Sequence, residues 1–187
     1  FEILYAPDFS PDALETLAAK NRIVLQAKPF APENVKLRTA LNGLLVQEED
    51  AVASRADELK IVTARRPTEN ETQDLIFAEK IAKHLKSNAV AVVKNLQLIG
   101  AGAGQSSRVE AVRLAVERAR HNGFSLQGAV LASDAFFPFP DGVQIAHEAG
   151  VEVFVQPGGS IRDQDVVRYC EQNRLCMAFT GVRHFRH

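Results

Sequence analysis

The sequence has little cysteine and methionine, almost no net charge and no long hydrophobic run. Its two cysteines, Cys170 and Cys176, are too few for a disulfide framework or a zinc site of the usual kind, which fits a reducing cytoplasm. The formal net charge of -1 argues against a broad nucleic-acid or membrane-binding surface. No apolar run approaches the roughly 20 residues that span a bilayer, and no signal-peptide pattern opens the chain.

The chain begins at Phe1, and Met177 is its one methionine, so we expect these 187 residues to be a piece of a longer polypeptide. Their length allows one sizeable core or two small domains. The hydrophobic content of 46% is typical of a globular protein.

Several catalytic signatures are also missing. The sequence has no His-x-Glu followed by Pro-Cys-x-x-Cys, which excludes a zinc deaminase site, and no Gly-x-Ser-x-Gly elbow. The glycine-rich segment at residues 100–108 has Gln105 in the last place of Gly-x-Gly-x-x-Gly, so it is not a Rossmann fingerprint. It also lacks the Gly-Lys-Ser/Thr of a Walker loop. The segment is either a binding loop that a ligand approaches closely or a plain strand-to-helix turn.

Hydrophobic periodicity predicts helices that alternate with strands, hence an α/β fold. Strands are expected at residues 1–5, 23–25, 37–41, 44–46, 59–63, 89–93, 96–99, 129–132, 151–155 and 175–179. Helices are expected at residues 11–20 after the cap Ser10, from a capping box at Thr68 and Glu71 through Leu85, and at 109–120, 143–148 and 163–173, with Asp141 as the cap of the fourth. Asn42-Gly43 predicts a hairpin turn. A soft domain boundary is expected between residues 46 and 68.

Three loops follow predicted strands, at residues 100–108, 133–141 and 156–161, and we expect them to gather at one edge of the sheet, where α/β proteins bind ligands. In the second loop Phe136, Phe137 and Phe139 either stack on flat rings or pack into the core. In the third, the N–H groups of residues 156–160 either receive a carboxylate or carbonyl group or belong to a plain turn.

The chain ends with Arg183-His184-Phe185-Arg186-His187. Such a tail is usually frayed and solvated, but if it is docked, Arg183 becomes an anion ligand, because a guanidinium holds phosphate or carboxylate by paired hydrogen bonds. Asn88 stands at a strand start beside the glycine segment, where its amide can donate to and accept from a carboxamide. Lys83 and His84 are explained by the favourable placement of positive charge at a helix C-terminus.

Taken together, five ordered motifs resemble the transformylase region at the C-terminal end of the bifunctional purine biosynthesis proteins. The family carries AICAR transformylase and IMP cyclohydrolase activities. The motifs are Lys86-Ser87-Asn88-Ala89, Gly102-Ala103-Gly104-Gln105-Ser106-Ser107-Arg108, Ser133-Asp134-Ala135-Phe136-Phe137-Pro138-Phe139, Gln156-Pro157-Gly158-Gly159-Ser160-Ile161-Arg162-Asp163 and the terminal Arg183 to His187. The resemblance implies that residues 1–66 are the trailing part of the preceding transformylase subdomain and residues 67–187 the C-terminal subdomain.

The resemblance also implies a three-layer α/β/α, cytidine-deaminase-like mixed sheet without zinc. The implied reaction moves the formyl group of the cosubstrate 10-formyltetrahydrofolate to the 5-amino group of AICAR, giving FAICAR. By motif position, AICAR would be bound by Asn88, Arg108, Phe136 and Arg183, with the first two on its carboxamide. The folate would lie along Val109, Asp141, Ser160 and Ile161. A cytoplasmic homodimer with sites shared between subunits, and a structural monovalent cation, are implied as well.

This sequence departs from the family pattern in three respects. The essential Lys-His pair of the family, in a Lys-His-Val-x-Pro type motif, is absent, and Lys83-His84 is not that pair. The cyclohydrolase domain is missing. Pro140 stands where related chains often have arginine, which weakens an anion contact near the folate. We therefore expect this chain to supply the binding half of a site and to be inactive alone. The alternatives are a noncatalytic dimerisation module and an unrelated domain that binds nucleotide phosphate on its glycine segment.

Overall fold

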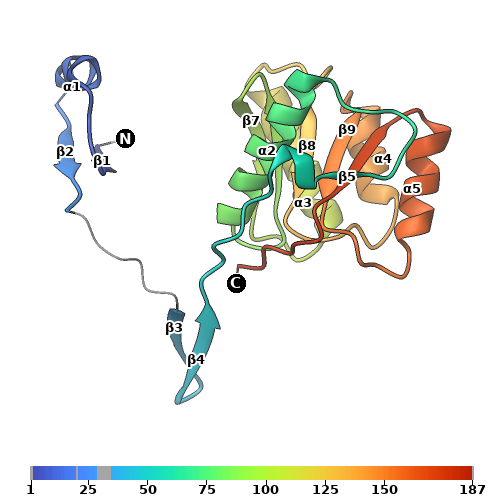
Figure 1. Ribbon diagram of the computed structural model, residues 1–187, viewed down its shortest axis with the longest axis horizontal. Coiled ribbons are helices and arrows are strands. Elements are labelled where there is room, and N and C mark those ends of the chain that lie inside the picture. The colour runs from blue at the N-terminus through green and yellow to red at the C-terminus, as the bar shows by residue number, and fades with distance from the viewer. Residues whose placement is uncertain (1, 20, 29–34, 187) are drawn as a thin grey trace. The chain divides into compact units, whose positions relative to one another are not determined.

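A computed structural model describes residues 2–19, 21–28 and 35–186 of the chain (Figure 1). The chain divides into two compact units, Phe1–Asp50 and Ala51–His187, and each is described here by itself. Helices and strands occur in both units, so the predicted α/β class is confirmed. None of the helices in the described ranges combines the length and apolar character that crossing a membrane requires.

The first unit begins with a strand–helix–strand arrangement. Strand β1 (Ile3–Ala6) pairs in parallel with β2 (Ile23–Gln26), and helix α1 (Pro11–Ala18) connects them. The Ser10 side chain accepts a hydrogen bond from the backbone N–H of Ala13, as the predicted cap requires. All three elements confirm the sequence prediction within two residues at the ends that the structure describes; Phe1 and Lys20 lie outside the described residues.

The rest of the first unit is a hairpin of β3 (Val35–Ala40) and β4 (Gly43–Glu48). The predicted hairpin is confirmed. The prediction that Asn42 and Gly43 are its two turn residues is wrong. Ala40 pairs with Gly43, so the turn residues are Leu41 and Asn42, with φ angles of 48° and 59°. A two-residue turn with positive φ at both positions matches the right-handed twist of the strands. Residues 29–34, which precede β3 in the sequence, lie outside the described residues.

The second unit is built on a six-stranded mixed sheet with the order β5-β10-β9-β8-β6-β7. Strands β8, β9 and β10 are parallel, whereas β6 is antiparallel to both of its neighbours and β5 is antiparallel to β10. The bounds are β5 (Lys60–Ile61), β6 (Val90–Lys94), β7 (Gln97–Gly102), β8 (Val130–Ser133), β9 (Val153–Gln156) and β10 (Cys176–Phe179).

Helices cover both faces of this sheet (Figure 1). Helix α2 (Glu69–His84) packs on one face, where Leu75 and Val93 belong to one buried cluster. The other face carries α3 (Arg108–His121), α4 (Asp141–Glu148) and α5 (Asp163–Gln172). Its buried cluster includes Phe137 and Phe154. Burial on both faces explains why the central strands are continuous apolar runs rather than alternating patterns.

The division between the units falls between Asp50 and Ala51, within the interval of residues 46–68 where the sequence predicts a soft boundary. Two contacts hold the segment that follows it in the second unit. Strand β5 pairs with β10, and the Thr63 hydroxyl accepts a hydrogen bond of 2.9 Å from the backbone N–H of Met177. Residues between 51 and 66 are therefore held by the second unit.

The glycine segment is only partly a loop. Gly100 and Gly102 lie in β7, which extends through the first three positions that the sequence assigned to the loop. A Cβ atom on Gly102 would stand 1.9 Å from the carbonyl oxygen of Ala111, and one on Gly100 would stand 2.2 Å from that of Ala115. These glycines let α3 lie directly on the strand, whereas Gly104, with φ of 69°, is a true loop residue.

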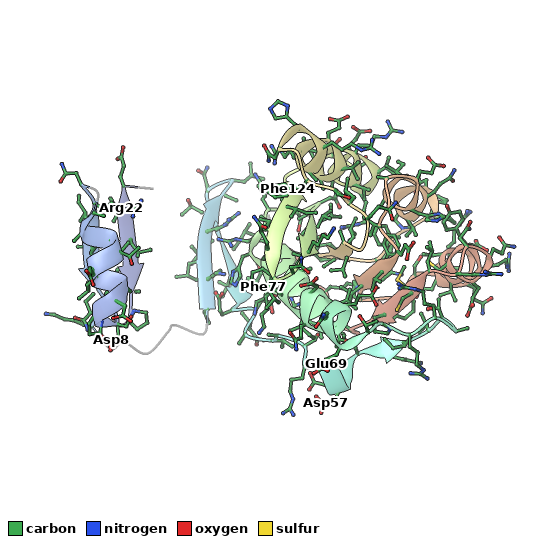
Figure 2. All side chains as sticks on the ribbon, turned by 90° about the horizontal axis from the view of Figure 1, so that it is seen from above. Asp8, Arg22, Asp57, Glu69, Phe77 and Phe124 are labelled. Atoms are coloured by element: carbon green, nitrogen blue, oxygen red, sulfur yellow. The ribbon has the colours of Figure 1, made fainter. Side chains whose placement is uncertain are left out.

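Two helix starts show how well local signals predict caps. The Thr68 hydroxyl accepts from the Glu71 N–H at 3.3 Å, and the Glu71 carboxylate accepts from the Thr68 N–H at 2.8 Å, which confirms the capping box. Figure 2 labels Glu69 at the start of this helix. The predicted cap Asp141 is wrong: α4 has Pro140 at its cap position, and Asp141 is the first helical residue. The Asp141 carboxylate accepts a hydrogen bond of 2.8 Å from the N–H of the neighbouring Gly142.

Replacing Glu71 with alanine is expected to lower the free energy of unfolding by about 1 kcal/mol at neutral pH, because it removes half of the capping box. Burial alone would raise the pKa of Glu71, but hydrogen bonds from the Thr68 backbone and Arg65, with the Arg65 charge, hold it below its ordinary value of 4.5. A depressed pKa gives stability above 4.5 that is lost as pH falls through the folded value. Urea titrations at pH 7 and pH 3 measure this.

The matched control is Glu69→Ala, which removes an exposed acidic residue from the same first turn without breaking the box. We expect Glu69→Ala to lower the free energy of unfolding by less than Glu71→Ala does, because it removes only the interaction of a negative charge with the helix dipole. If Glu71→Ala lowers the free energy of unfolding by as much at pH 3 as at pH 7, the ionised carboxylate does not have the proposed role.

Candidate functional site

The candidate site lies at the edge of the second unit's sheet where β7, β8, β9 and β10 end. Strands β7 and β8 are both antiparallel to β6, so their carboxyl ends meet the amino end of β6, and β9 and β10 run parallel to β8. The three loops that the sequence singled out, and Asn88 before β6, therefore come to one edge as predicted. Open α/β sheets bind ligands at such edges.

A buried ion pair organises this edge. Arg108, the first residue of α3, is 7% exposed, and its Nη1 atom pairs with the carboxylate of Asp134, which is fully buried. The same nitrogen donates to Ser133 Oγ at 2.7 Å and to the Ala89 carbonyl at 3.3 Å. Asp134 also accepts from Ser87 Oγ at 2.6 Å. Charges removed from water are tolerated when they are paired and hydrogen-bonded in this way, and the result is a fixed guanidinium.

Asn88 is joined directly to this guanidinium. Its Oδ1 accepts from Arg108 Nη2 at 3.0 Å, and its Nδ2 donates to the Gln105 carbonyl at 3.0 Å. The backbones of Asn88 and Gln105 also exchange two hydrogen bonds, at 3.3 and 3.4 Å. The structure thus brings together the two residues predicted at the carboxamide and holds their side chains in fixed orientations. Neither group is a base at neutral pH, so the arrangement binds and polarises rather than removes protons.

The three phenylalanines of the second loop have different environments. Phe137 is in the core, as the packing alternative predicted, with 1% of its surface exposed. Phe136 is half-buried and lies under Arg183, whose guanidinium carbon is 4.8 Å from the ring centroid. Arg183 also donates to the Gly159 carbonyl at 3.4 Å. Two residues predicted to contact AICAR, 47 positions apart in the sequence, therefore form a cation–π pair.

The C-terminal tail is docked, so the expectation of a frayed tail is wrong through Arg186; His187 lies outside the described residues. The His184 N–H donates to the Asp134 carbonyl at 2.9 Å, and Arg186 and Ser87 exchange hydrogen bonds of 2.8 and 3.0 Å. The His184 ring, 2% exposed, reaches the carboxylate of Glu79 on α2 at 3.3 Å. These contacts place Arg183 at the site edge, as the docked alternative requires.

The turn after β9 already holds an anion. The Gly159 and Ser160 N–H groups donate to the Asp163 carboxylate at 2.6 and 3.1 Å. These two N–H groups are therefore occupied by the chain's own Asp163 side chain, as in the plain-turn alternative. The buried Gln156 side chain accepts from the Phe137 N–H at 2.6 Å, so it fixes the second loop. The sequence singled out residue 156 for its backbone N–H and did not predict this role of its side chain, since nothing local distinguishes Gln156 from an ordinary strand residue.

The four residues predicted along the folate lie at the same edge. Val109 is half-buried in the first turn of α3, and Asp141 is exposed in the first turn of α4. The Ser160 hydroxyl accepts from the Arg162 N–H at 3.1 Å, and Ile161 is fully exposed.

Other features lie outside this arrangement. Burial raises the pKa of the Cys170 thiol to about 12 and that of Cys176 to about 11, so both remain protonated at neutral pH and are poor nucleophiles. Lys83 donates to the Val52 carbonyl at 2.7 Å, in the last turn of α2. Over the described ranges, no group of three or more His, Cys, Asp or Glu side chains is arranged to hold a metal ion. A pocket of about 400 Å³ on α2 contains none of the predicted site residues and is lined by Ala56, Thr72, Gln73, Ile76, Phe77, Lys80 and Leu96.

Comparison with known proteins gives a family match. Residues 1–118 match the AICARFT/IMPCHase bienzyme family. The chain is 47% identical over 188 residues to the bifunctional purine biosynthesis protein PurH of Bacteroides thetaiotaomicron and 50% identical over 188 residues to that of Chlorobaculum parvum. All of the chain is covered, but only 37% and 36% of these relatives, so the chain spans little more than a third of their length.

Among solved structures, one similar chain is a diaminohydroxyphosphoribosylaminopyrimidine deaminase/5-amino-6-(5-phosphoribosylamino)uracil reductase from Thermotoga maritima. It is 25% identical, with a TM-score of 0.29, and the match covers 47% of this chain and 28% of that one. A TM-score this low assigns no fold.

Proposed function

The chain belongs to the AICARFT/IMPCHase bienzyme family, and from this premise we propose that it is part of an AICAR transformylase of purine nucleotide biosynthesis. The reaction would transfer the formyl group of 10-formyltetrahydrofolate to the 5-amino group of AICAR, giving FAICAR. The observation that carries the proposal is the direct contact of Asn88 with Arg108, beside the stacked pair of Phe136 and Arg183, at one edge of the sheet. Such a site offers a carboxamide partner, a flat apolar face and a cation for phosphate.

In this proposal Arg108 and Asn88 hold the AICAR carboxamide, Phe136 contacts the base, and Arg183 binds the phosphate. A fixed guanidinium suits the carboxamide oxygen, because its position is already set by Asp134 and requires no reorganisation on binding. The Arg183 guanidinium lies over the Phe136 ring, so the N–H donors of Arg183 are close to the same edge of the sheet.

Formyl transfer also needs groups that this site lacks. The amine nitrogen attacks the formyl carbon and loses a proton, an oxyanion forms, and the bond from that carbon to N10 of the folate then breaks. Asn88 and Arg108 position AICAR but cannot accept the proton. We therefore infer that this chain supplies the binding half of the site. A Lys-His pair from another part of the protein would complete it, and in a homodimer the two halves would come from different subunits.

The proposal extends to the folate and to the fold. Val109, Asp141, Ser160 and Ile161 would line 10-formyltetrahydrofolate beside the nucleotide. The helices on both faces of the second unit are compatible with a zinc-free, cytidine-deaminase-like subdomain at residues 67–187, following the trailing part of another at residues 1–66. A cytoplasmic location and a structural monovalent cation belong to the same proposal.

Isothermal titration calorimetry on the purified 187-residue chain tests this function. We expect weak, saturable binding of AICAR and of a folate analogue, no formyl transfer, and weaker binding of AMP, which lacks the carboxamide. Equal affinity for AMP would favour a general phosphate site on the glycine segment, and no binding of any of the three would favour a noncatalytic dimerisation module. Robust formyl transfer by the chain alone would overturn the inferred division of the site.

A further inference from the structure

A buried carboxylate on α2 has no role in the site described so far, yet it touches the tail that carries Arg183. Glu79 is 3% exposed, and its partners Ser54 and His184 are buried with it. Glu79 Oε1 accepts from the Ser54 hydroxyl at 2.5 Å and lies 3.3 Å from the His184 ring nitrogen Nε2. Its Oε2 accepts from the Ser54 N–H at 3.3 Å. One carboxylate thus joins the segment that opens the second unit to the C-terminal tail.

Stability alone does not account for a carboxylate at this position. The cost of removing a charge from water offsets most of what its hydrogen bonds contribute, so a buried charged group adds little net stability. Its effect is to hold its partners in one orientation, because buried polar partners must meet each other to be satisfied. A carboxylate only accepts hydrogen bonds, so the His184 ring is oriented with Nε2 toward Glu79.

The orientation of His184 is passed on to Arg183, the residue before it. His184 is held through its ring on α2 and through its backbone N–H, which donates to the Asp134 carbonyl at 2.9 Å. Arg183 is exposed, and its own contacts are weak: the Phe136 ring at 4.8 Å and a hydrogen bond of 3.4 Å to the Gly159 carbonyl. An exposed cation–π contact contributes about 1 kcal/mol or less. The anchored neighbour is therefore what keeps the Arg183 guanidinium in place.

We propose that Glu79 is a positioning residue, which holds the C-terminal tail on α2 through the His184 ring and thereby fixes the Arg183 guanidinium at the site edge. Because Glu79 also binds Ser54, Ser54→Ala should loosen the tail in the same way, but to a smaller extent. The placement of the tail is independent of any ligand. Its consequence for AICAR binding rests on the proposed function, in which Arg183 binds the phosphate.

Hydrogen exchange followed by NMR on the 187-residue chain tests the positioning role without a ligand. Glu79→Leu is expected to speed exchange of the His184 and Arg186 amides about tenfold relative to the amides of β8, as loss of a charge-assisted hydrogen bond does. Both tail amides donate hydrogen bonds within the docked tail's contacts. Glu79→Gln keeps an oxygen that accepts from the His184 ring, so it should restore most of the protection.

Asp74→Leu is the matched control. Asp74 is also a buried carboxylate on α2, 5% exposed, but it accepts from the N–H groups of Asn95 and Leu96 at 2.9 and 2.6 Å, in the turn between β6 and β7. Its loss should leave tail exchange unchanged relative to β8. No increase in Glu79→Leu, or an equal increase in Asp74→Leu, would overturn the proposal.

A second variant removes the same contact from the side of the tail. His184→Phe lacks the ring nitrogens and should speed exchange of the Arg186 amide as Glu79→Leu does, so it tests the proposal even if Glu79→Leu does not fold. Where both fold, the double variant should exchange no faster than either single one, because both remove one interaction. Additive effects would show that Glu79 does not act through His184.

Calorimetry with AICAR and with its ribonucleoside, which lacks the phosphate, measures the consequence for binding. Glu79→Leu and Arg183→Ala are each expected to weaken binding of AICAR about tenfold and to leave that of the ribonucleoside unchanged. Equal losses for both ligands in Glu79→Leu alone would overturn the action through Arg183. If the tail loosens but neither variant changes AICAR binding, the positioning role stands and the phosphate assignment in the proposed function fails.

Discussion

Replacing Arg108 with alanine is expected to lower the free energy of unfolding by about 3–5 kcal/mol and to remove binding of AICAR. The loss of stability follows from Asp134, whose fully buried carboxylate would keep its hydrogen bond from Ser87 but lose its cation. The loss of binding follows because Asn88 would lose the group that fixes its side-chain oxygen. Urea unfolding monitored by circular dichroism gives the first quantity, and calorimetry gives the second.

The matched control is Arg113→Ala on the same helix. The Arg113 side chain is 56% exposed and pairs with Glu110 at 3.4 Å, so its loss should change stability by less than about 0.5 kcal/mol. If Arg108→Ala does not fold, Asn88→Ala keeps the ion pair and tests binding alone, with an expected large loss of AICAR affinity. Equal stability of the two arginine variants would refute the ion-pair argument. Unchanged AICAR binding by a folded Arg108 or Asn88 variant would refute the assigned site.

Local signals in the sequence were enough to predict most helices and strands of both units. The capping box at Thr68 and Glu71 is a short-range pattern whose two hydrogen bonds need no tertiary contact, and the structure contains both. Parallel and antiparallel directions then follow from the chain order, which is why the three loops could be expected at one edge. Errors arose where one local signal competes with another, as at Asp141, where the proline before it takes the cap position.

The partners inside the site could not be predicted in the same way. Arg108 and Asp134 are 26 positions apart, and His184 reaches Glu79 across 105 positions. Nothing in the residue types around Glu79 distinguishes it from a solvated helical glutamate, and the partners that meet it in the buried site, Ser54 and His184, are distant in the sequence. The occupied turn at Gly159 is similar, because a glycine turn looks the same in sequence whether its N–H groups are free or bound to Asp163.

Replacing Gly102 with valine is expected to lower the free energy of unfolding by at least about 3 kcal/mol, the upper end of the usual cost of overpacking a core. The sequence suggested that this glycine makes room for a ligand, whereas the structure has helix α3 in that space. A Cβ atom there would stand 1.9 Å from the Ala111 carbonyl oxygen and 2.7 Å from the carbonyl carbon. Both are backbone atoms, so no change of side-chain rotamer relieves the overlap, and α3 must move away from β7.

Gly43→Val provides the control, because it also adds a β-branched side chain to a glycine in a strand. The nearest atom to its Cβ would be the Ala40 carbonyl oxygen at 3.4 Å, an ordinary contact distance. Its effect should stay below about 1 kcal/mol, since valine favours strands. Urea unfolding of both variants separates the two explanations of the glycine pattern. If Gly102→Val were no more destabilising than Gly43→Val but abolished AICAR binding, the glycine would serve ligand approach rather than helix packing. A large loss of stability for Gly102→Val alone would instead establish that α3, and with it Arg108, owes its position on the strand to the absence of a side chain there.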